Sequence, residues 1–290
     1  MSDIPLAPLN RLIIEGPVRT ALLEDLGLAG DVTSNAIIPA SHRAQLVMAA
    51  RKPGVIAGLD VAEIAFQLVD PAISVTRHCE DGTGVAAGDI IATIDGPSRS
   101  LLTGERTALN FLCHLSGIAS VTAGIVQAIA GTKAAVVCTR KTTPGLRALE
   151  KYAVRAGGGR NHRFALHDAV LIKDNHVAIA GGIAQAIARA KAGVGHMVKI
   201  EVEVDTLDQL REAMATGVDA VLLDNMTPAQ LRQAVAFVDG RAITEASGNI
   251  TPETAPAIAA AGVDLMSVGW ITHSAPVLDI GLDFVAAAQG

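Results

Sequence analysis

The sequence predicts an α/β protein in which an N-terminal α+β unit precedes a parallel β/α barrel. The first observation is that apolar runs alternate with Ala-rich helical segments from about residue 134 onward, which is typical of a parallel sheet. The second is that the first hundred residues instead mix short alternating runs with two helical patterns. The third is length, because 290 residues favour two domains or one domain with a large appendage.

The N-terminal elements follow from local patterns. Residues 10–26 are predicted to form a helix that ends at Gly27, and Asp31, Thr33 and Ser34 are expected to supply turn or cap chemistry before the next element. Four short runs are predicted strands because apolar and polar residues alternate in them, and one helix is expected between two of these strands. The strands lie at 44–50, 54–58, 72–78 and 88–96, and the helix at 60–69.

Residues 107–132 carry no Lys, Arg, Asp or Glu, and they exceed the roughly 20 residues that a membrane-spanning helix needs. Polar residues are scattered through this stretch, among them His114, Ser116 and Ser120. We therefore interpret it as a buried helix of a large protein and expect no membrane.

Six apolar runs are the predicted strands of the second half, and helical segments separate them. The residues that end the later runs stand 21 to 30 positions apart, as short as β/α units become, which favours a closed or nearly closed barrel. A doubly wound open sheet is the alternative, but no G-x-G-x-x-G turn follows the first strand. Six strands rather than eight leave room for an incomplete barrel or for a strand missed within 114–133. The runs are 134–139, 168–173, 199–204, 219–224, 241–246 and 264–269.

Composition excludes several functions. A net charge of −6 and an aromatic content of 2% argue against a nucleic-acid binder. Cys79, Cys113 and Cys138 lack the close spacing of a disulfide framework or zinc site, and the first ten residues lack the pattern of a signal peptide. We therefore expect a cytoplasmic protein. His162, His167, His176 and His273 lack the spacing of a helical zinc pair, which argues against a dedicated metal cage.

Polar or flexible residues follow each predicted barrel strand, where parallel β/α folds gather their chemistry. For a single residue, a structural ion-pair network is the alternative, but convergence from six strand ends favours a ligand site. The set comprises Thr139, Arg140 and Lys141, Lys173 to His176, Glu203 and Asp205, Asp224 and Asn225, Glu245 with Ser247 to Asn249, and Gly269.

The local charge indicates the kind of ligand. Residues 139–163 hold seven Lys or Arg and one acid, which suits a small polyanion in an otherwise acidic protein. Three of these bases recur at i+4, so a solvated helix face is the alternative for them, whereas three others lie at strand or loop ends. The former are Arg147, Lys151 and Arg155, and the latter are Arg140, Lys141 and Arg163. The run Gly157 to Gly159 either approaches a ligand or forms a flexible loop.

The last two strand ends are typical of a phosphate site. Ser247-Gly248-Asn249 follows one run, and Thr251 to Glu253 then predict a helix start. Gly269 ends the last run, and His273 follows it. Beside such loops, Glu203 and Asp224 would hold sugar hydroxyls or Mg²⁺, or balance the charge of nearby lysines.

The residues leave other functions open. A Schiff-base aldolase would use Lys173 as its nucleophile, and a non-catalytic anion-binding protein would bind a phosphate-rich ligand without turning it over. A Ser-His-Asp hydrolase finds no support, because G-x-S-x-G is absent.

Long motifs of the chain resemble quinolinate phosphoribosyltransferase, the decarboxylating nicotinate-nucleotide pyrophosphorylase family. The resemblance runs over most of the chain, and its longest block extends from the TRK at 139 to the KDNH that ends at 176. The motifs are EDLGLAGDVTS, RKPGVIAG, GERTALNFLCHLSGIA, TRKTTPGLRALEKYAVRAGGGRNHR, LIKDNHV, EVEVD, LLDNM, EASGNI, SVGWITHS and LDIGLDF.

The resemblance implies an α/β fold with an open, irregular β/α barrel of about six to seven strands and an N-terminal α+β sandwich domain. The implied domains are residues 1–113 for the sandwich, 114–274 for the barrel and 275–290 for a tail that returns to the sandwich. A related phosphoribosyltransferase that acts on another pyridine or azole acid is one alternative within this resemblance. The reaction that the resemblance implies converts quinolinate and phosphoribosyl pyrophosphate to nicotinate mononucleotide, pyrophosphate and CO₂ in NAD biosynthesis. It takes place in a homodimer or a higher homo-oligomer, with Mg²⁺ held mainly by pyrophosphate and water and with Glu203 and Asp224 as candidate ligands.

Site residues are carried over from the same resemblance. The quinolinate group comprises Arg106, Thr139, Arg140, His162, Arg163 and Lys173. The phosphoribosyl pyrophosphate group comprises Lys141, Glu203, Asp224, Ser247, Gly248, Asn249, Gly269 and His273, and the catalytic group comprises Lys141, Lys173, Glu203 and Asp224. Arg106 is expected at the opening of the long uncharged helix, and the neighbouring subunit is expected to supply it.

Overall fold

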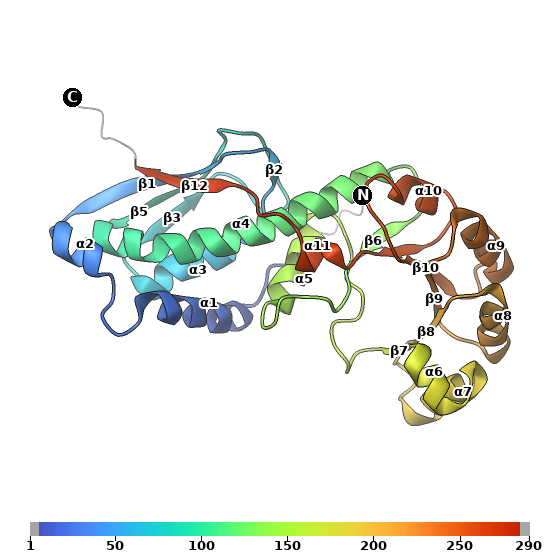
Figure 1. Cartoon of the computed structure of the whole chain (residues 1–290). Coiled ribbons are helices and arrows are strands. Elements are labelled where there is room, and N and C mark those ends of the chain that lie inside the picture. Colours follow the sequence, from blue (N-terminus) through green and yellow to red (C-terminus); the bar gives the residue numbers. More distant parts are fainter. Residues whose placement is uncertain (1–5, 285–290) are drawn as a thin grey trace. The chain divides into compact units, whose positions relative to one another are not determined.

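A computed structural model describes residues 6–284, and it confirms the predicted fold class (Figure 1). The chain forms two compact units. Unit 1 comprises Met1–Ala123, Thr142–Gly158 and Thr272–Gly290, and unit 2 comprises Gly124–Lys141 and Gly159–Ile271. The two units are defined by their compactness alone. The domain limits that the resemblance implies therefore stay a prediction.

Unit 1 is built on a four-stranded antiparallel sheet in the order β12-β1-β5-β3. Figure 1 shows α1, α3 and α4 on one face of this sheet. Aliphatic residues such as Ile91 and Ile94 of β5 are fully buried, as the low aromatic content requires. The strands are β1 (Arg43–Ala50), β3 (Ser74–Arg77), β5 (Ile90–Pro97) and β12 (Ile280–Phe284), and β2 (Gly54–Val55) pairs with β4 (Gly84–Val85). The helices are α1 (Arg11–Leu26), α2 (Val32–Ile37), α3 (Leu59–Val69), α4 (Ser98–Ala128) and α5 (Arg147–Ala156).

Of the three residues expected to supply turn or cap chemistry, Asp31 is the N-cap of α2, whereas Thr33 and Ser34 lie inside that helix. The side chain of Asp31 accepts a hydrogen bond from the backbone N–H of Ser34 at 2.9 Å, which satisfies a donor that the first turn of α2 leaves without an intrahelical partner. The predicted end of α1 at Gly27 is also confirmed, because this glycine occupies the C-cap with φ +52°.

Helix α4 is long and apolar enough to cross a membrane, but 56% of its most apolar window is buried in the protein. Polar side chains of this helix form hydrogen bonds inside the protein. Ser116 and Ser120 accept hydrogen bonds from the backbone N–H groups of Ala57 and Val55, at 3.0 and 2.8 Å. They satisfy backbone donors of a neighbouring segment that would otherwise be buried without a partner. These contacts support the interpretation of α4 as a core helix.

Helix α4 begins at Ser98, so Arg106 lies inside the helix and the expectation that it opens the helix is wrong. The solvated helix face proposed for α5 is also wrong for Lys151, which is fully buried. Gly157 ends α5 where a Cβ would lie 2.4 Å from the carbonyl oxygen of Ala119 on α4. Close packing inside unit 1 therefore explains the first glycine of the run.

Unit 2 is a six-stranded parallel sheet in the order β6-β11-β10-β9-β8-β7. In the described chain β6 and β7 are the terminal strands, so the barrel is open, and residues 114–134 form helix and turns rather than a missed strand. All six predicted runs are confirmed as strands. They are β6 (Ala135–Val137), β7 (Val170–Ile172), β8 (Ile200–Val204), β9 (Ala220–Asp224), β10 (Ile243–Ser247) and β11 (Leu265–Ser267).

Helices cover the outside of this sheet in Figure 1. Thr206 and Thr227 begin two of them with reciprocal capping boxes to Gln209 and Gln230. The helix start predicted at Thr251 is wrong, because residues 252–254 form turns and α10 begins only at Ala255. The helices are α6 (Asp174–Ala180), α7 (Ile183–Gly193), α8 (Leu207–Thr216), α9 (Pro228–Val238), α10 (Ala255–Ala259) and α11 (Trp270–His273), the last at the boundary of the two units.

The packing of Gly117 on α4 generates a stability prediction. A Cβ at this position would lie 2.1 Å from the carbonyl oxygen of Pro276 and 3.0 Å from the Cα of Val277. We expect Gly117→Ala to lower the free energy of unfolding by about 1–3 kcal/mol, because backbone must move to admit the methyl group. Urea titration followed by circular dichroism measures the change.

Gly124 on the same helix is the matched control, because no atom lies within 4 Å of its ideal Cβ. Gly124→Ala should keep or raise the stability, by up to about 1 kcal/mol, since alanine is the better helix former. Equal destabilisation by the two substitutions would contradict the packing argument.

Candidate active site

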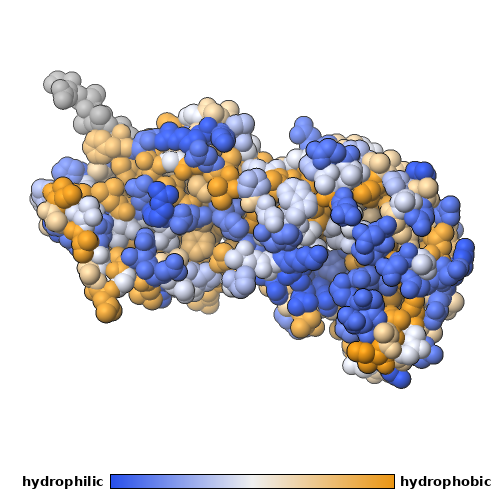
Figure 2. Space-filling model, in the orientation of Figure 1, coloured by the Kyte–Doolittle hydropathy of each residue, from blue (hydrophilic) through white to orange (hydrophobic). Residues whose placement is uncertain are grey.

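A cavity of about 510 Å³ lies in unit 2 at the carboxyl ends of the parallel strands. Strand register brings these ends level, because Ser247 of β10 pairs with Asp224 of β9 and with Ser267 of β11. Hydrophilic side chains surround the hollow on this part of the surface in Figure 2. The lining residues are Thr139, Arg140, Lys141, His162, Arg163, Leu171, Lys173, Glu203, Leu222, Asp224, Glu245, Ser247 and Ser267.

Lys173 and Glu203 form the ion pair at the mouth of this cavity. The Nζ of Lys173 lies 2.5 Å from the Oε2 of Glu203, with the lysine side chain 46% exposed. The backbone N–H of Lys173 donates to the Nδ1 of His176 at 2.9 Å, which ties the end of β7 to the first turn of α6. An ammonium group held by a carboxylate is a poor nucleophile, so this geometry does not favour a Schiff-base role for Lys173.

Arg140 and Arg163 place two guanidinium groups on the same cavity. Burial, together with the charge of Arg140, lowers the pKa of Arg163 below its ordinary value, while its Nη1 donates to the carbonyl oxygen of Ala169 at 3.2 Å. The Nε of Arg140 is buried without a hydrogen-bond partner among the described residues. An unsatisfied buried donor costs about 1–3 kcal/mol, which an anion bound here would offset.

The loop after β10 approaches the loop after β9 closely. The backbone N–H of Asn225 donates to the carbonyl oxygen of Ser247 at 2.9 Å. Gly248 has φ +99°, and a Cβ there would lie 2.1 Å from the Oδ1 of Asn225, so only glycine fits. Asn249 also adopts a positive φ, of 51°. Because α10 begins only at Ala255 and has five residues, this loop rather than a helix N-terminus would contact a phosphate.

The structure brings together nine of the residues predicted for the site. Gly248, Asn249 and Gly269 belong to unit 2 but do not line the cavity, and Arg106 and His273 belong to unit 1. His273 is exposed, and its ring contacts the hydroxyl of Ser274 at 2.7 Å. The nine lining residues are Thr139, Arg140, Lys141, His162, Arg163, Lys173, Glu203, Asp224 and Ser247.

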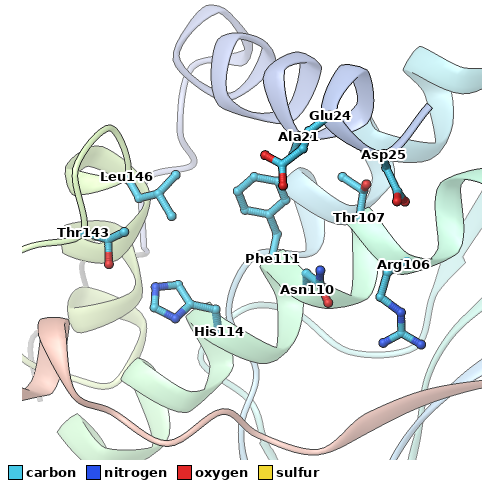
Figure 3. Close-up of a pocket in the computed structure, with 10 residues that line it drawn as sticks. All are labelled: Ala21, Glu24, Asp25, Arg106, Thr107, Asn110, Phe111, His114, Thr143 and Leu146. Atoms are coloured by element: carbon cyan, nitrogen blue, oxygen red, sulfur yellow. The ribbon is translucent and has the colours of Figure 1, made fainter. Parts of the chain in front are cut away.

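Arg106 lines a separate cavity of about 380 Å³ inside unit 1, between α1 and α4 (Figure 3). Asp25 and Glu24 reach this cavity from α1, and Asn110 and His114 follow Arg106 along α4. Arg106 is exposed and forms no ion pair within residues 6–284.

His162 contacts two buried carboxylates, of which the sequence analysis named Glu245 as a strand-end residue but missed Glu201 and the link of both acids to His162. Glu201 of β8 and Glu245 of β10 are 8% and 1% exposed, and an oxygen of each faces the Nε2 of His162. The signal in the sequence is the presence of acids inside two apolar runs, Glu201 and Glu203 in KIEVEV and Glu245 in RAITEA. The side-chain ligand atoms of His162, Glu201 and Glu245 lie within 4.8 Å of one another, a spacing that could also hold a metal ion.

The chemistry of the cavity follows from its charges. Two arginines and two lysines provide a cationic wall for acidic groups of a ligand, and Glu203, Asp224 and Ser247 provide acceptors for hydroxyl groups. In a protein whose net charge is −6, the arrangement suits a small molecule that carries several negative charges.

Comparison with known families matches both parts of the chain. Residues 31–116 match the family described as quinolinate phosphoribosyl transferase, N-terminal domain, and residues 118–283 match its C-terminal domain. The chain is 46% identical over 271 residues to nicotinate-nucleotide pyrophosphorylase [carboxylating] of Mycobacterium leprae, covering 92% of this chain and 95% of the relative. It is 44% identical over 276 residues to the probable enzyme of that name from Bacillus subtilis, covering 95% and 94%.

Solved structures agree with this match. The crystal structure of NadC from Streptococcus pyogenes superposes with a TM-score of 0.92 at 43% identity, covering 97% of this chain and 100% of that one. The nicotinate-nucleotide pyrophosphorylase from Francisella tularensis superposes equally well, with a TM-score of 0.92 at 38% identity and coverage of 98% and 100%. The chain belongs to the quinolinate phosphoribosyl transferase family.

Proposed function

We propose that the unit 2 cavity is the active site of this family's reaction. The protein transfers a phosphoribosyl group from phosphoribosyl pyrophosphate to quinolinate and releases pyrophosphate and CO₂, which yields nicotinate mononucleotide for NAD biosynthesis. The observation that carries the assignment is the convergence of Arg140, Lys141, Arg163 and Lys173 on one cavity. Both substrates are small polyanions, and neither could bind without such a wall.

Quinolinate is assigned to the side of Arg140, His162 and Arg163. Its two carboxylates need planar, charged donors, and arginine forks match carboxylate geometry. The buried Nε of Arg140 is a donor that a carboxylate would satisfy. Thr139 lies beside Arg140, where its hydroxyl accepts from the backbone N–H of Lys141 at 3.0 Å. Lys173 completes the group from the next strand end.

Phosphoribosyl pyrophosphate is assigned to the opposite set of groups. Lys141 and Ser247 would contact phosphate oxygens, with the close-packed Gly248 to Asn249 turn and Gly269 offering backbone. Glu203 and Asp224 would hold ribose hydroxyls. His273, in unit 1, stays a proposed donor-binding residue from the family resemblance.

Catalysis by these residues rests mainly on positioning and electrostatics. Loss of pyrophosphate leaves positive charge on C1 of the ribose, and the carboxylates of Glu203 and Asp224 would stabilise that charge. Lys141 would offset charge that develops on the leaving pyrophosphate. After transfer, the cationic ring nitrogen stabilises the electron pair that loss of CO₂ leaves at C2, and C2 then takes up a proton from solvent, so this step needs no general base.

The donor set fits a magnesium ion that is carried chiefly by pyrophosphate oxygens and water. Mg²⁺ favours one or two carboxylates together with phosphate oxygens. Glu203 already pairs with the ammonium of Lys173, whereas Asp224 accepts from the neutral amide of Asn225 at 2.7 Å. Asp224 is therefore the better-placed protein ligand. The ion, when bound, would neutralise charge on the leaving group.

We further propose a homodimer, in which Arg106 of one protomer serves the cavity of the other. An exposed arginine on α4 without an ion pair in the described chain is suited to such a role. A cytoplasmic location also stays a prediction. The cysteines support it, because Cys79, Cys113 and Cys138 are all free thiols.

Release of labelled CO₂ tests the activity directly. Protein incubated with quinolinate labelled at the C2 carboxylate, phosphoribosyl pyrophosphate and Mg²⁺ should release labelled CO₂ and pyrophosphate in equal amounts. Omission of the donor should abolish both products, because decarboxylation requires a ribosylated ring nitrogen. Binding of both substrates without release of pyrophosphate would instead identify an anion-binding protein.

Alanine substitutions of the two arginines test the quinolinate side. Each charged hydrogen bond contributes about 1.5–3 kcal/mol, so Arg140→Ala and Arg163→Ala should each weaken quinolinate binding roughly 10- to 150-fold. Isothermal titration calorimetry measures the affinity. Arg160→Ala is the matched control, because Arg160 is an exposed arginine of the same segment that does not line the cavity. Unchanged affinity in both variants would remove the pair from the site.

Mixing of two inactive variants tests the shared site. Arg106→Ala and Asp224→Asn should each lose activity alone, yet a mixed dimer would contain one intact site if Arg106 acts across the interface. Random reassortment should then restore about a quarter of the wild-type activity, since about half of the dimers are mixed and each has one good site. No recovery after confirmed subunit exchange would place Arg106 in its own protomer's site or outside any site.

A further inference from the structure

His162 faces two carboxylates that come from different strands of the unit 2 sheet. Its Nε2 lies 2.8 Å from an oxygen of Glu201 on β8 and 3.6 Å from an oxygen of Glu245 on β10. The side chains of His162, Glu201 and Glu245 are 13%, 10% and 1% exposed. Strand β9 separates β8 from β10 in the sheet, so both acids project inward to reach the same ring.

Burial of two carboxylates at this spacing demands a compensating cation. An uncompensated buried charge costs several kcal/mol, and both oxygens of Glu245 lack a hydrogen-bond partner among the described residues. Glu201 accepts the hydrogen bond of the imidazole at 2.8 Å, which fixes the orientation of the ring. Glu245 makes no such bond, so its effect on His162 is electrostatic.

Other charged groups surround the cluster but do not replace the imidazole. Lys173 favours the ionised form of Glu245, and it is itself paired with Glu203. The further ionisable groups that face the cavity, from β9 and from the segments near β6, are Asp224, Arg140, Lys141 and Arg163. Glu245 is the most buried ionisable residue that lines the cavity, with 1% of its surface exposed. None of the steps assigned to the reaction uses it.

We propose that Glu245 is a positioning residue that, with Glu201, keeps the His162 ring protonated on both nitrogens, so that it meets a quinolinate carboxylate as a cation. The inference rests on the proposed assignment of His162 to quinolinate. It adds a residue that does not touch substrate and acts through the imidazole.

The sign of the pH dependence follows from the charge on Glu245. Burial, and then the neighbouring Glu201, raises the pKa of Glu245 to about 7. Below that pH Glu245 is neutral, and His162 is protonated with the help of Glu201 alone. Above it Glu245 gains a negative charge beside the ring, which opposes loss of the imidazole proton. Glu245 therefore extends the cationic state of His162 toward alkaline pH.

The test is the pH profile of kcat/KM for quinolinate in Glu245→Gln, a variant of nearly the same shape. We expect values within about two- to three-fold of wild type at pH 6 and about ten-fold lower at pH 8.5, since one opposite charge at this distance moves a titration by a unit or more. The loss should lie in the KM for quinolinate, with the KM for the phosphoribosyl donor little changed. Equal loss at both pH values would indicate a merely structural role and overturn the proposal.

Two further variants separate charge from shape. Glu245→Asp retains the carboxylate and should recover most of the alkaline activity. Asp208→Asn removes one carboxylate from an exposed position on α8 of the same unit, where the side chain is 91% exposed, and should leave the profile unchanged. A profile for Asp208→Asn like that of Glu245→Gln would overturn the assignment to Glu245.

Nitrogen NMR of the histidine-labelled wild-type protein provides a readout that does not depend on activity. The resonances of His162, assigned with His162→Asn, should show both ring nitrogens protonated at pH 8, and a neutral ring at that pH would overturn the proposal. A divalent ion bound to the purified wild-type chain but lost from Glu245→Gln would overturn it in favour of a metal site. Absence of CO₂ release from wild type would refute the proposed function while leaving the NMR result interpretable.

Discussion

Compensation of buried charge is the constraint on which the structure of unit 2 depends. The sheet of unit 2 is built from apolar strands, yet Glu201, Glu203 and Glu245 point inward from them. Each acid is placed against a cation or an imidazole, as the Lys173–Glu203 pair at 2.5 Å illustrates. Removal of one partner would leave a buried charge that costs several kcal/mol. In the proposed site, residues such as Lys173 and Glu203 therefore serve both the stability of the sheet and the binding of substrates.

The other unit meets a different requirement, the satisfaction of backbone groups around a long core helix. The serines of α4 accept hydrogen bonds from a neighbouring loop, and His114 contacts the buried carboxylate of Glu150 at 2.9 Å. The second oxygen of Glu150 accepts from the backbone N–H of Thr143 at 3.1 Å. Thr143 stands two residues after Lys141, so a network inside unit 1 fixes the chain close in sequence to a residue of the site.

Periodic patterns in the sequence were sufficient to predict most of the fold. Six alternating runs predicted six parallel strands, and Gly27 and Asp31 marked a helix end and a helix start, because these signals are local. The errors arose where tertiary packing decides whether a residue is buried or where a helix begins. The i+4 spacing of Arg147, Lys151 and Arg155 could not show that Lys151 is buried, and Thr251 has the chemistry of an N-cap although the helix begins four residues later.

The part of the candidate site that lies at strand ends could be predicted from the sequence. Arg140, Lys173, Glu203 and Asp224 follow directly from the rule that parallel strands deliver function at their carboxyl ends. Glu245 also belongs to the predicted strand-end set, but the sequence could not show that it shares one buried cluster with Glu201 and His162, because in a sequence an inward acid looks the same as an outward one. Arg106 lies outside the rule altogether, since only the family resemblance connects it with the cavity.

The charged residues of unit 2 therefore form two layers, an outer one at the strand ends and an inner one buried within the sheet. In the proposed site the outer layer at the strand ends faces the substrates, and its groups are partly exposed, so solvent weakens their mutual interactions. The inner layer of His162, Glu201 and Glu245 is nearly dry, so one proton there changes the local field more than a proton at the rim does. A reaction that removes negative charge as pyrophosphate and develops positive charge on ribose depends on that field. Under the proposed function, the buried residues Glu201 and Glu245 therefore contribute to the electrostatics of the reaction.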